Sequence, residues 1–256
     1  MKITLDEAAK IIGDAQTIIL TSHIRPDGDS IGSTLGLMHY LRAQGKDARV
    51  LIDDDLPRIF NILPGIETIE RPAEGTRYAA DLLIVCDVEL KRTGNVISSV
   101  DAVRVLNIDH HVTNDEEAEY LYLNPDYAAT CEIMHDLILA MGGAFSLDVA
   151  TCLYTGIATD TGFFRFSNTT PHTMRAAADL VEVGVKPNII SVAMEMKSFD
   201  EMMAQVRAIR NLEMFHDGRV AAVFIDEERA KEVTTTEGLL DKLRVIEGTQ
   251  VVFFMK

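Results

Sequence analysis

The sequence predicts an α/β fold: a mostly parallel sheet flanked by helices, followed by a linker helix and a partial smaller α/β domain. Two observations carry this prediction. Short apolar runs suited to buried strands alternate with segments of helical periodicity. Three of those runs end in side chains that can bind metals. Because the carboxyl ends of parallel strands lie at one edge of a sheet, these side chains are expected to gather there.

A helix and a strand lead to the first candidate site. Thr4 and Glu7 have the spacing of a capping box, which predicts a helix to about residue 15. The apolar run 17–20 then predicts a short buried strand. The loop after this strand holds three metal-capable side chains, namely His23, Asp27 and Asp29.

That loop has the features of a phosphate and cation site. A proline and a glycine within it favour a tight turn, and helical spacing begins directly after it. The loop therefore joins the end of a strand to the start of a helix, whose dipole favours phosphate. No thiolate is nearby in the sequence, so a hard cation is favoured over a structural zinc.

Two later strands repeat this arrangement, after a predicted strand at 48–52. The run 82–86 is apolar throughout, as in a strand buried on both faces, and the run 103–108 is similar. The residues that directly follow these two runs are Asp87 and, after the second, Asp109, His110 and His111.

The rest of the chain is predicted to be mainly helical until a second, smaller region. The predicted elements are helices at 129–141, 147–159 and 171–183, a long helical tract at 188–215, a strand at 220–225, a helix at 236–245 and a strand at 250–255. The second of these helices leads into Asp160. We therefore divide the chain into a metal-binding domain at 1–187, a linker helix at 188–215 and an incomplete C-terminal domain at 216–256.

Composition limits the class of protein. Hydrophobic residues make up 47% of the 256 residues, but they form no long apolar run, so no membrane span is expected. The N-terminal segment also lacks the charged and apolar regions of a signal peptide. Three cysteines without CxxC spacing favour a reducing cytoplasm. The formal net charge of −16 disfavours tight binding to long nucleic acid but does not exclude a short phosphorylated substrate held by metal.

The sequence thus holds four metal-capable sites, and their combination is more informative than any one of them. They are His23 with Asp27 and Asp29, then Asp87, then Asp109 with His110 and His111, and lastly Asp160. Each alone is compatible with a helix cap, a turn or a surface position. At neighbouring strand ends, however, several carboxylates would lie close together, and cations would be needed to offset their repulsion. Two divalent ions roughly 3.5–4 Å apart would do so, and such a pair is typical of phosphoryl-transfer sites.

The motifs resemble those of the DHH phosphoesterase family. The matching segments are residues 22–30, residues 85–87 with Arg92 and Gly94, residues 108–114 and residues 154–162. The extended motif at 160–168 is similar to the branch that degrades short oligoribonucleotides and dephosphorylates 3′-phosphoadenosine 5′-phosphate. The resemblance implies a manganese-dependent phosphoesterase acting on such short oligoribonucleotides, on dinucleotides or on that nucleotide.

The resemblance also implies a set of ligands for two divalent ions, most readily Mn²⁺. His23, Asp27 and Asp87 would hold one ion. The other would be held by Asp29, Asp87, His110 and Asp160, so that Asp87 bridges the pair.

Three further residues receive roles by the same resemblance. His111 would be the catalytic residue that faces the scissile phosphate, and Asp109 would orient the two histidines. Arg165 would bind a substrate phosphate through its guanidinium, while a surface arginine on an edge strand is the equally weighted alternative.

One departure from the family pattern concerns the C-terminal region. Members of this branch carry a Gly-Gly-Gly-His stretch in a companion domain, and this sequence has none, so the chain is expected to end before that domain is complete. Two alternatives stay open: a pyrophosphatase-like hydrolase of small phosphates and a nucleotide-binding regulatory protein with weak turnover. A homodimer is one option for its assembly.

Overall fold

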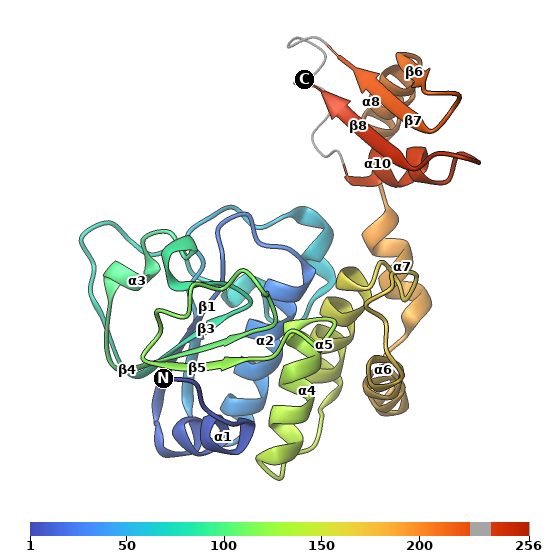
Figure 1. The fold of residues 1–256 in the computed structure, drawn as a ribbon. Coiled ribbons are helices and arrows are strands. Elements are labelled where there is room, and N and C mark those ends of the chain that lie inside the picture. Colours follow the sequence, from blue (N-terminus) through green and yellow to red (C-terminus); the bar gives the residue numbers. More distant parts are fainter. Residues whose placement is uncertain (226–236, 256) are drawn as a thin grey trace. The chain divides into compact units, whose positions relative to one another are not determined.

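The computed structural model describes residues 1–225 and 237–255, and the chain forms two compact units, Met1–Met194 and Glu195–Lys256 (Figure 1). The first unit is built from α1 (Leu5–Asp14), β1 (Thr17–Thr21), α2 (Gly28–Ala43), β2 (Asp47–Val50), β3 (Tyr78–Cys86), α3 (Val96–Ser99), β4 (Val100–Asp109), β5 (Tyr120–Leu123), α4 (Thr130–Ala140), α5 (Leu147–Asp160), α6 (Pro171–Val183) and α7 (Pro187–Glu195). No helix within the described ranges has the length and apolar character needed to cross a bilayer.

The strands of the first unit form one parallel sheet in the order β2-β1-β3-β4-β5. The strand order reverses between β1 and β3, since β2 lies on one side of β1 and the later strands lie on the other. Ligands of open α/β sheets bind at such a reversal, outside the carboxyl ends of the strands. The predicted sheet is confirmed, and its switch point lies between the strands that precede His23 and Asp87.

Alternate residues of the central strands enter two separate cores. Ile18 and Leu20 of β1 belong to a large core that includes residues of α1, α2, α4 and α5 (Figure 1). Ile19 of the same strand packs instead with Leu83 of β3 and Val96 of α3 on the other face. Both faces are covered, which is why the strands are apolar at consecutive positions.

Helices α2 and α5 pack closely because glycines lie between them. A Cβ atom on Gly32 of α2 would lie 2.5 Å from the carbonyl oxygen of Cys152 of α5. On Gly156 of α5, it would lie 2.9 Å from Oδ1 of Asp29. Only glycine fits at these two positions without a shift, and the close approach brings the first turn of α2 beside the end of α5.

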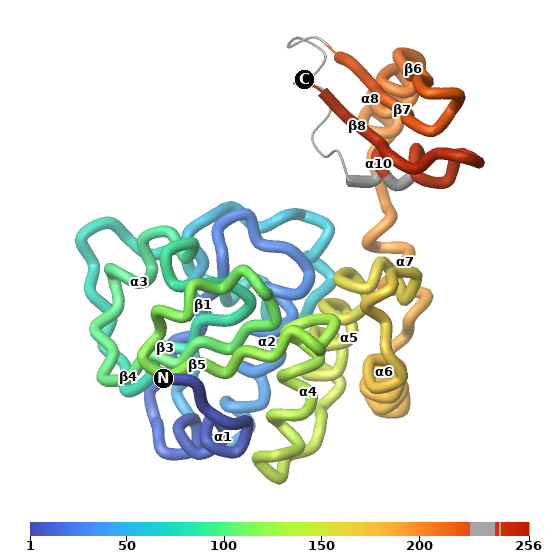
Figure 2. The backbone as a smooth tube through the Cα atoms, viewed as in Figure 1, coloured from blue at the N-terminus to red at the C-terminus, as the bar shows by residue number. Residues whose placement is uncertain are grey.

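The sheet ends in a short strand that the sequence analysis did not predict. β5 has four residues, and its Leu121 donates a backbone hydrogen bond to the carbonyl of Met1 at 2.9 Å. Figure 2 shows the N-terminus beside this strand. A Tyr-Leu-Tyr-Leu segment is too short for its period to be read, and its strand conformation depends on pairing with β4.

The second unit contains α8 (Phe199–Ile209), β6 (Leu212–Phe215), β7 (Val220–Phe224), α10 (Glu237–Arg244) and β8 (Val251–Met255). β7 pairs antiparallel with β6 and parallel with β8, and its Ala221 and Val223 form a small core with Leu239 of α10.

The prediction of a single helical tract at 188–215 is wrong. Ser198 and Glu201 form a capping box that begins a new helix, α8, after α7 has ended. Residues 212–215 form β6 instead, because Leu212 pairs with Val223 of β7. The boundary between the two units falls inside the predicted linker, and the predicted domain limits stay a prediction.

Candidate metal centre

Three groups of carboxylate and imidazole side chains gather at the carboxyl edge of the parallel sheet, and two of them share no residue. We call His23, Asp27 and Asp87 the His23 group, and Asp29, His110 and Asp160 the His110 group. In each group the potential ligand atoms lie within 4.8 Å of one another. The structure therefore brings together all six residues that the sequence analysis predicts as metal ligands.

The His23 group begins in the loop between β1 and α2. Asp27 is the N-cap of α2, and its Oδ1 accepts hydrogen bonds from the backbone N–H of Asp29 and Ser30 at 3.1 and 3.0 Å. Its Oδ2 lies 3.6 Å from Nε2 of His23. The other ring nitrogen of His23 lies 2.9 Å from the carbonyl oxygen of Ile24, so donation from Nδ1–H leaves Nε2 facing the carboxylates.

Asp87 lies between the two groups and directly after β3. Its Oδ2 is 3.6 Å from Nε2 of His23, and its Oδ1 is 3.5 Å from Nε2 of His110. The side chain is 2% exposed, and the backbone has a φ of 66°, in the left-handed region that is uncommon for residues other than glycine. A buried carboxylate that faces two imidazoles through separate oxygens is typical of a functional position.

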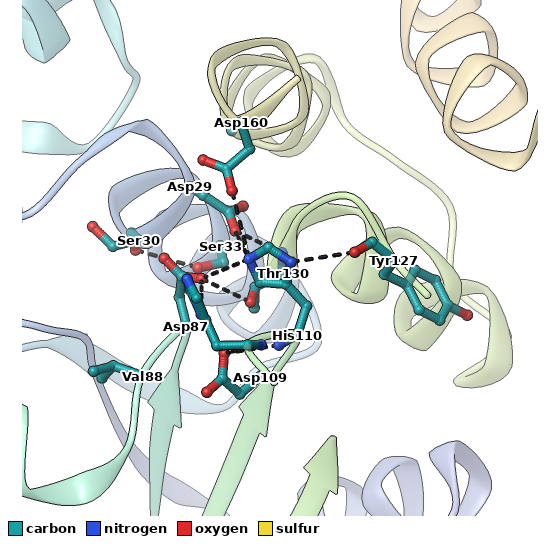
Figure 3. A network of polar contacts seen from close by, with 12 residues as sticks. Asp29, Ser30, Ser33, Asp87, Val88, Asp109, His110, Tyr127, Thr130 and Asp160 are labelled. Atoms are coloured by element: carbon teal, nitrogen blue, oxygen red, sulfur yellow. Dashed lines mark hydrogen bonds and ion pairs between the residues drawn. The ribbon is translucent and has the colours of Figure 1, made fainter. Parts of the chain in front are cut away.

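The His110 group is assembled from three distant elements. Asp29 comes from the first turn of α2, His110 follows β4, and Asp160 is the last residue of α5. Nε2 of His110 is 3.9 Å from Asp29 and 3.5 Å from Asp160. Figure 3 shows Asp29, Asp87 and Asp160 arranged around this imidazole.

The N-terminus of α4 supports the buried carboxylates. The backbone N–H groups of Thr130 and Cys131 donate to the two oxygens of Asp29 at 2.6 and 2.7 Å. The hydroxyl of Thr130 donates to Oδ1 of Asp87 at 3.1 Å. A helix N-terminus stabilises a carboxylate through its free N–H groups and its dipole. The sequence analysis missed this role, because the helix start was visible in the sequence but its partner was not.

One buried nitrogen of the site lacks a hydrogen-bond partner. His110 donates through Nδ1 to the carbonyl of Tyr127 at 3.2 Å, which leaves Nε2 as the acceptor whenever the imidazole is neutral. Nε2 is buried and has no hydrogen-bond partner among the described residues. Buried polar atoms are nearly always paired, and a divalent cation would satisfy this one. A set of imidazole nitrogens and carboxylate oxygens suits such an ion.

Charge in the site is unbalanced. Burial and repulsion from Asp87 raise the pKa of Asp29 well above its usual range and that of Asp160 to about 7. Burial lowers the pKa values of His23 and His110, but neighbouring carboxylates outweigh it and raise both to about 10. Burial also raises the pKa of Asp87, yet the facing imidazoles hold it well below its usual value. Protons therefore compensate these carboxylates in the metal-free protein, and bound cations would replace them.

Asp109 holds the two adjacent histidines in place. Its Oδ1 accepts hydrogen bonds from the backbone N–H groups of His110 and His111 and lies 2.8 Å from Nδ1 of His111. Its Oδ2 accepts from Asn114 at 2.6 Å. Asp109 is fully buried, whereas the side chain of His111 is 43% exposed. The roles predicted for Asp109 and His111 stay predictions, and Asn114 is a support that the sequence analysis did not single out.

Arg165 lies in a turn directly after α5. Its Nε donates to the carbonyl of Gly162 at 2.7 Å, and the residue is exposed. The alternative of an edge strand is wrong, because residues 161–168 form turns. The backbone is left-handed at both Phe163 and Phe164, with φ values of 57° and 64°. Phosphate binding by Arg165 stays a prediction.

Comparison with known proteins identifies the family. Residues 17–157 match the DHH family, N-terminal domain. The chain belongs to the DHH family. The match covers all five strands of the parallel sheet and five of the six predicted metal ligands, and it ends shortly before Asp160.

Relatives extend the similarity over nearly the whole chain. The chain is 34% identical to the bifunctional oligoribonuclease and PAP phosphatase NrnA of Thermus thermophilus, over 93% of this chain and 72% of that protein. It is 25% identical to the protein of the same name from Bacillus subtilis, over 98% of this chain and 81% of that one. A crystal structure of an exopolyphosphatase-related protein from Bacteroides fragilis superposes with a TM-score of 0.85 at 25% identity, over 96% of this chain and 77% of that one.

The predicted family and class of enzyme are thereby confirmed. As a DHH phosphoesterase, the chain is a hydrolase of phosphoester bonds. The ligand assignments stay predictions, although the described geometry is compatible with each of them.

Proposed function

We propose that the protein is a two-metal, manganese-dependent phosphoesterase that acts on short oligoribonucleotides, on dinucleotides or on 3′-phosphoadenosine 5′-phosphate. The observation that carries the proposal is the position of Asp87, whose two oxygens face the His23 group and the His110 group separately. A carboxylate in this position suits the bridging ligand of a metal pair. The substrate class is proposed from the relatives named as oligoribonuclease and PAP phosphatase.

The two groups would hold one ion each. The His23 group would bind the first, and the His110 group with Asp87 would bind the second. When bound, the pair supplies Lewis-acid stabilisation of phosphoryl charge and lowers the pKa of a water molecule. Manganese is proposed from the resemblance to the family, and the imidazole and carboxylate donors suit it.

His111 is proposed to contact the scissile phosphate. It is the more exposed of the two adjacent histidines, with 43% of its side chain accessible against 13% for His110. Its hydrogen bond to buried Asp109 fixes the ring and, when the imidazole is charged, stabilises that charge. The same carboxylate contributes to raising the pKa of His111, which favours the cationic form that a phosphate would bind.

A short substrate in the cytoplasm fits the charge and the cysteines. The net charge of −16 opposes extended contact with a nucleic-acid backbone, whereas one or two phosphates can be held by the metal pair and Arg165. Cys86, Cys131 and Cys152 are buried and unpaired, as expected in a reducing compartment.

The test is hydrolysis by the purified chain with Mn²⁺ of three substrates: a dinucleotide, 3′-phosphoadenosine 5′-phosphate and pyrophosphate. We expect turnover of the first two and little of the third. Preference for pyrophosphate would favour the pyrophosphatase-like alternative. Tight binding of nucleotide without turnover would favour the regulatory one.

Substrate length gives a second test. We expect rates to fall as chains lengthen beyond a few nucleotides, because each further phosphate faces an acidic protein. Comparable rates on a dinucleotide and on a long single strand would contradict the proposed preference for short substrates.

A further inference from the structure

One short segment contacts the His110 group at several points without supplying a predicted ligand. Residues 127–131, which we call the 127–131 segment, comprise the end of the connection from β5 and the first two residues of α4. The carbonyl of Tyr127 accepts Nδ1–H of His110, and the first turn of α4 holds Asp29. The carbonyl of Ala128 accepts from Asn168, whose amide also donates to the carbonyl of Asp160.

A second polar cluster lies on the other side of this segment. We call Glu132, Asp136 and His172 the anchor cluster. The hydroxyl of Tyr127 donates to Asp136 at 2.7 Å, and the backbone N–H of Ala128 donates to Glu132 at 2.8 Å. Figure 3 shows the Tyr127 carbonyl facing His110 while its ring points away from the ligands.

His172 connects the two carboxylates of the anchor cluster. Its Nδ1 lies 2.8 Å from Glu132 and its Nε2 lies 3.0 Å from Asp136, so α6 is tied to α4. Glu132 is 1% exposed and has one oxygen engaged by His172 and the other by Ala128. Burying a carboxylate is costly unless its oxygens are satisfied, so this arrangement fixes the backbone at Ala128 firmly.

The anchor cluster is separate from the ligands themselves. Among the described residues, none of the three groups suited to a metal includes Glu132, Asp136 or His172. The sequence analysis did not single out His172. His172 nevertheless contacts Asp136, which accepts a hydrogen bond from the hydroxyl of Tyr127, and the carbonyl of Tyr127 accepts from Nδ1 of His110.

We infer that the anchor cluster positions the metal centre. It fixes Tyr127 and Ala128, so that the Tyr127 carbonyl selects the tautomer of His110 and aims Nε2 at the carboxylates. Glu132, Asp136 and His172 are thus positioning residues for the His110 group and not for the His23 group. The inference rests on the proposed two-metal site.

The test is titration calorimetry of the full chain with Mn²⁺ and no substrate. The wild-type protein is expected to bind two ions in two binding steps of the titration. The binding step that is lost in His110→Ala is the one that belongs to the His110 group. His172→Ala should weaken that step by about 10-fold or more, as is usual when the support of a ligating histidine is lost. The step of the His23 group should not change.

Matched variants separate positioning from general stability. Glu132→Gln can still accept from Ala128 and donate to His172, so it should bind Mn²⁺ more tightly at the His110 group than Glu132→Ala does. His39→Ala removes a histidine that contacts the carbonyl of Pro64 at 2.9 Å, away from the 127–131 segment, and should leave both steps unchanged. Melting temperatures are measured alongside, so that a variant that is only less stable is recognised.

The outcomes are distinct. Equal weakening of both steps in His172→Ala, or unchanged binding with a lower melting temperature, would overturn the inference while leaving the proposed function intact. A wild type that binds no divalent ion would overturn the proposed function, and the inference with it.

Discussion

The two ligand groups of the site are built in different ways. In the His23 group, His23 and Asp27 belong to one loop, and the side chain of Asp27 is 56% exposed. In the His110 group, Asp29 is fully buried. Its partner His110 directly follows β4, and its partner Asp160 is the last residue of α5. One group is mostly local in sequence, whereas the other exists only because three elements pack together.

Their supports differ accordingly. Asp27 caps its own helix, so the His23 loop is stabilised by hydrogen bonds within a few residues. Asp29 depends on the N-terminus of α4, about a hundred residues later, and His110 depends on Tyr127. A change in packing between helices should therefore weaken ion binding at the His110 group more than at the His23 group. Mutations should thus be able to affect ion binding at one group without the other.

The largest expected effect is at the residue the groups share. Asp87→Ala should weaken binding of both ions and abolish activity, with turnover lowered by about 10³-fold or more, because several kcal/mol of charge stabilisation would be lost. Calorimetry and a dinucleotide assay measure this. Asp55→Ala, at a side chain that is 97% exposed, is the matched control and should behave as wild type. Two unchanged manganese steps in Asp87→Ala would show that this carboxylate does not bridge.

The adjacent histidines should divide binding from turnover. His110→Ala should lose the ion of its group and keep that of the His23 group. His111→Ala should bind both ions and lose turnover by roughly 10²–10⁴-fold, the usual contribution of a positioned proton-transfer or phosphate-facing group. Metal content and turnover of the two variants are compared in parallel. An equal drop in metal content would mean that His111 is also a ligand.

Packing between α2 and α5 should affect only the buried group. In Gly156→Ala, the new Cβ would meet Asp29 and Cys131, so the free energy of unfolding should fall by about 1–3 kcal/mol and the ion of the His110 group should bind more weakly. Urea denaturation and calorimetry measure the two effects. Gly13→Ala in α1, where nothing lies within 4 Å of the new atom, should instead stabilise by up to about 1 kcal/mol. Unchanged binding in Gly156→Ala would show that the His110 group tolerates a shift of α2.

The smallest effect is a difference in pH dependence. With pKa values of about 10, His23 and His110 must each release a proton when an ion binds near neutral pH. Affinity at both groups should therefore fall as pH falls, by at most about tenfold per unit for each proton. Asp160, with a pKa of about 7, adds a second proton to the His110 group below that pH, so its affinity should fall more steeply. Calorimetry at pH 6, 7 and 8 tests this, and parallel slopes would contradict it.

The sequence by itself determined the three strands that precede the site and the edge of the sheet at which the site lies. The apolar runs before His23, Asp87 and Asp109 are buried strands because their side chains enter cores on both faces, and this is visible from local composition. The ends of parallel strands then fall at one edge for geometrical reasons. The motifs supplied the family and the set of predicted ligands.

Only the tertiary structure decided which of these residues face one another and what supports them. Asp27 and Asp29 are two residues apart, yet one points to His23 while the other is buried against α4. The 127–131 segment and the anchor cluster could not be predicted, since their partners are distant in sequence and nothing in local periodicity encodes them. β5 and β6 could not be predicted either. Each has four residues, and these form a strand only because a neighbouring strand pairs with them.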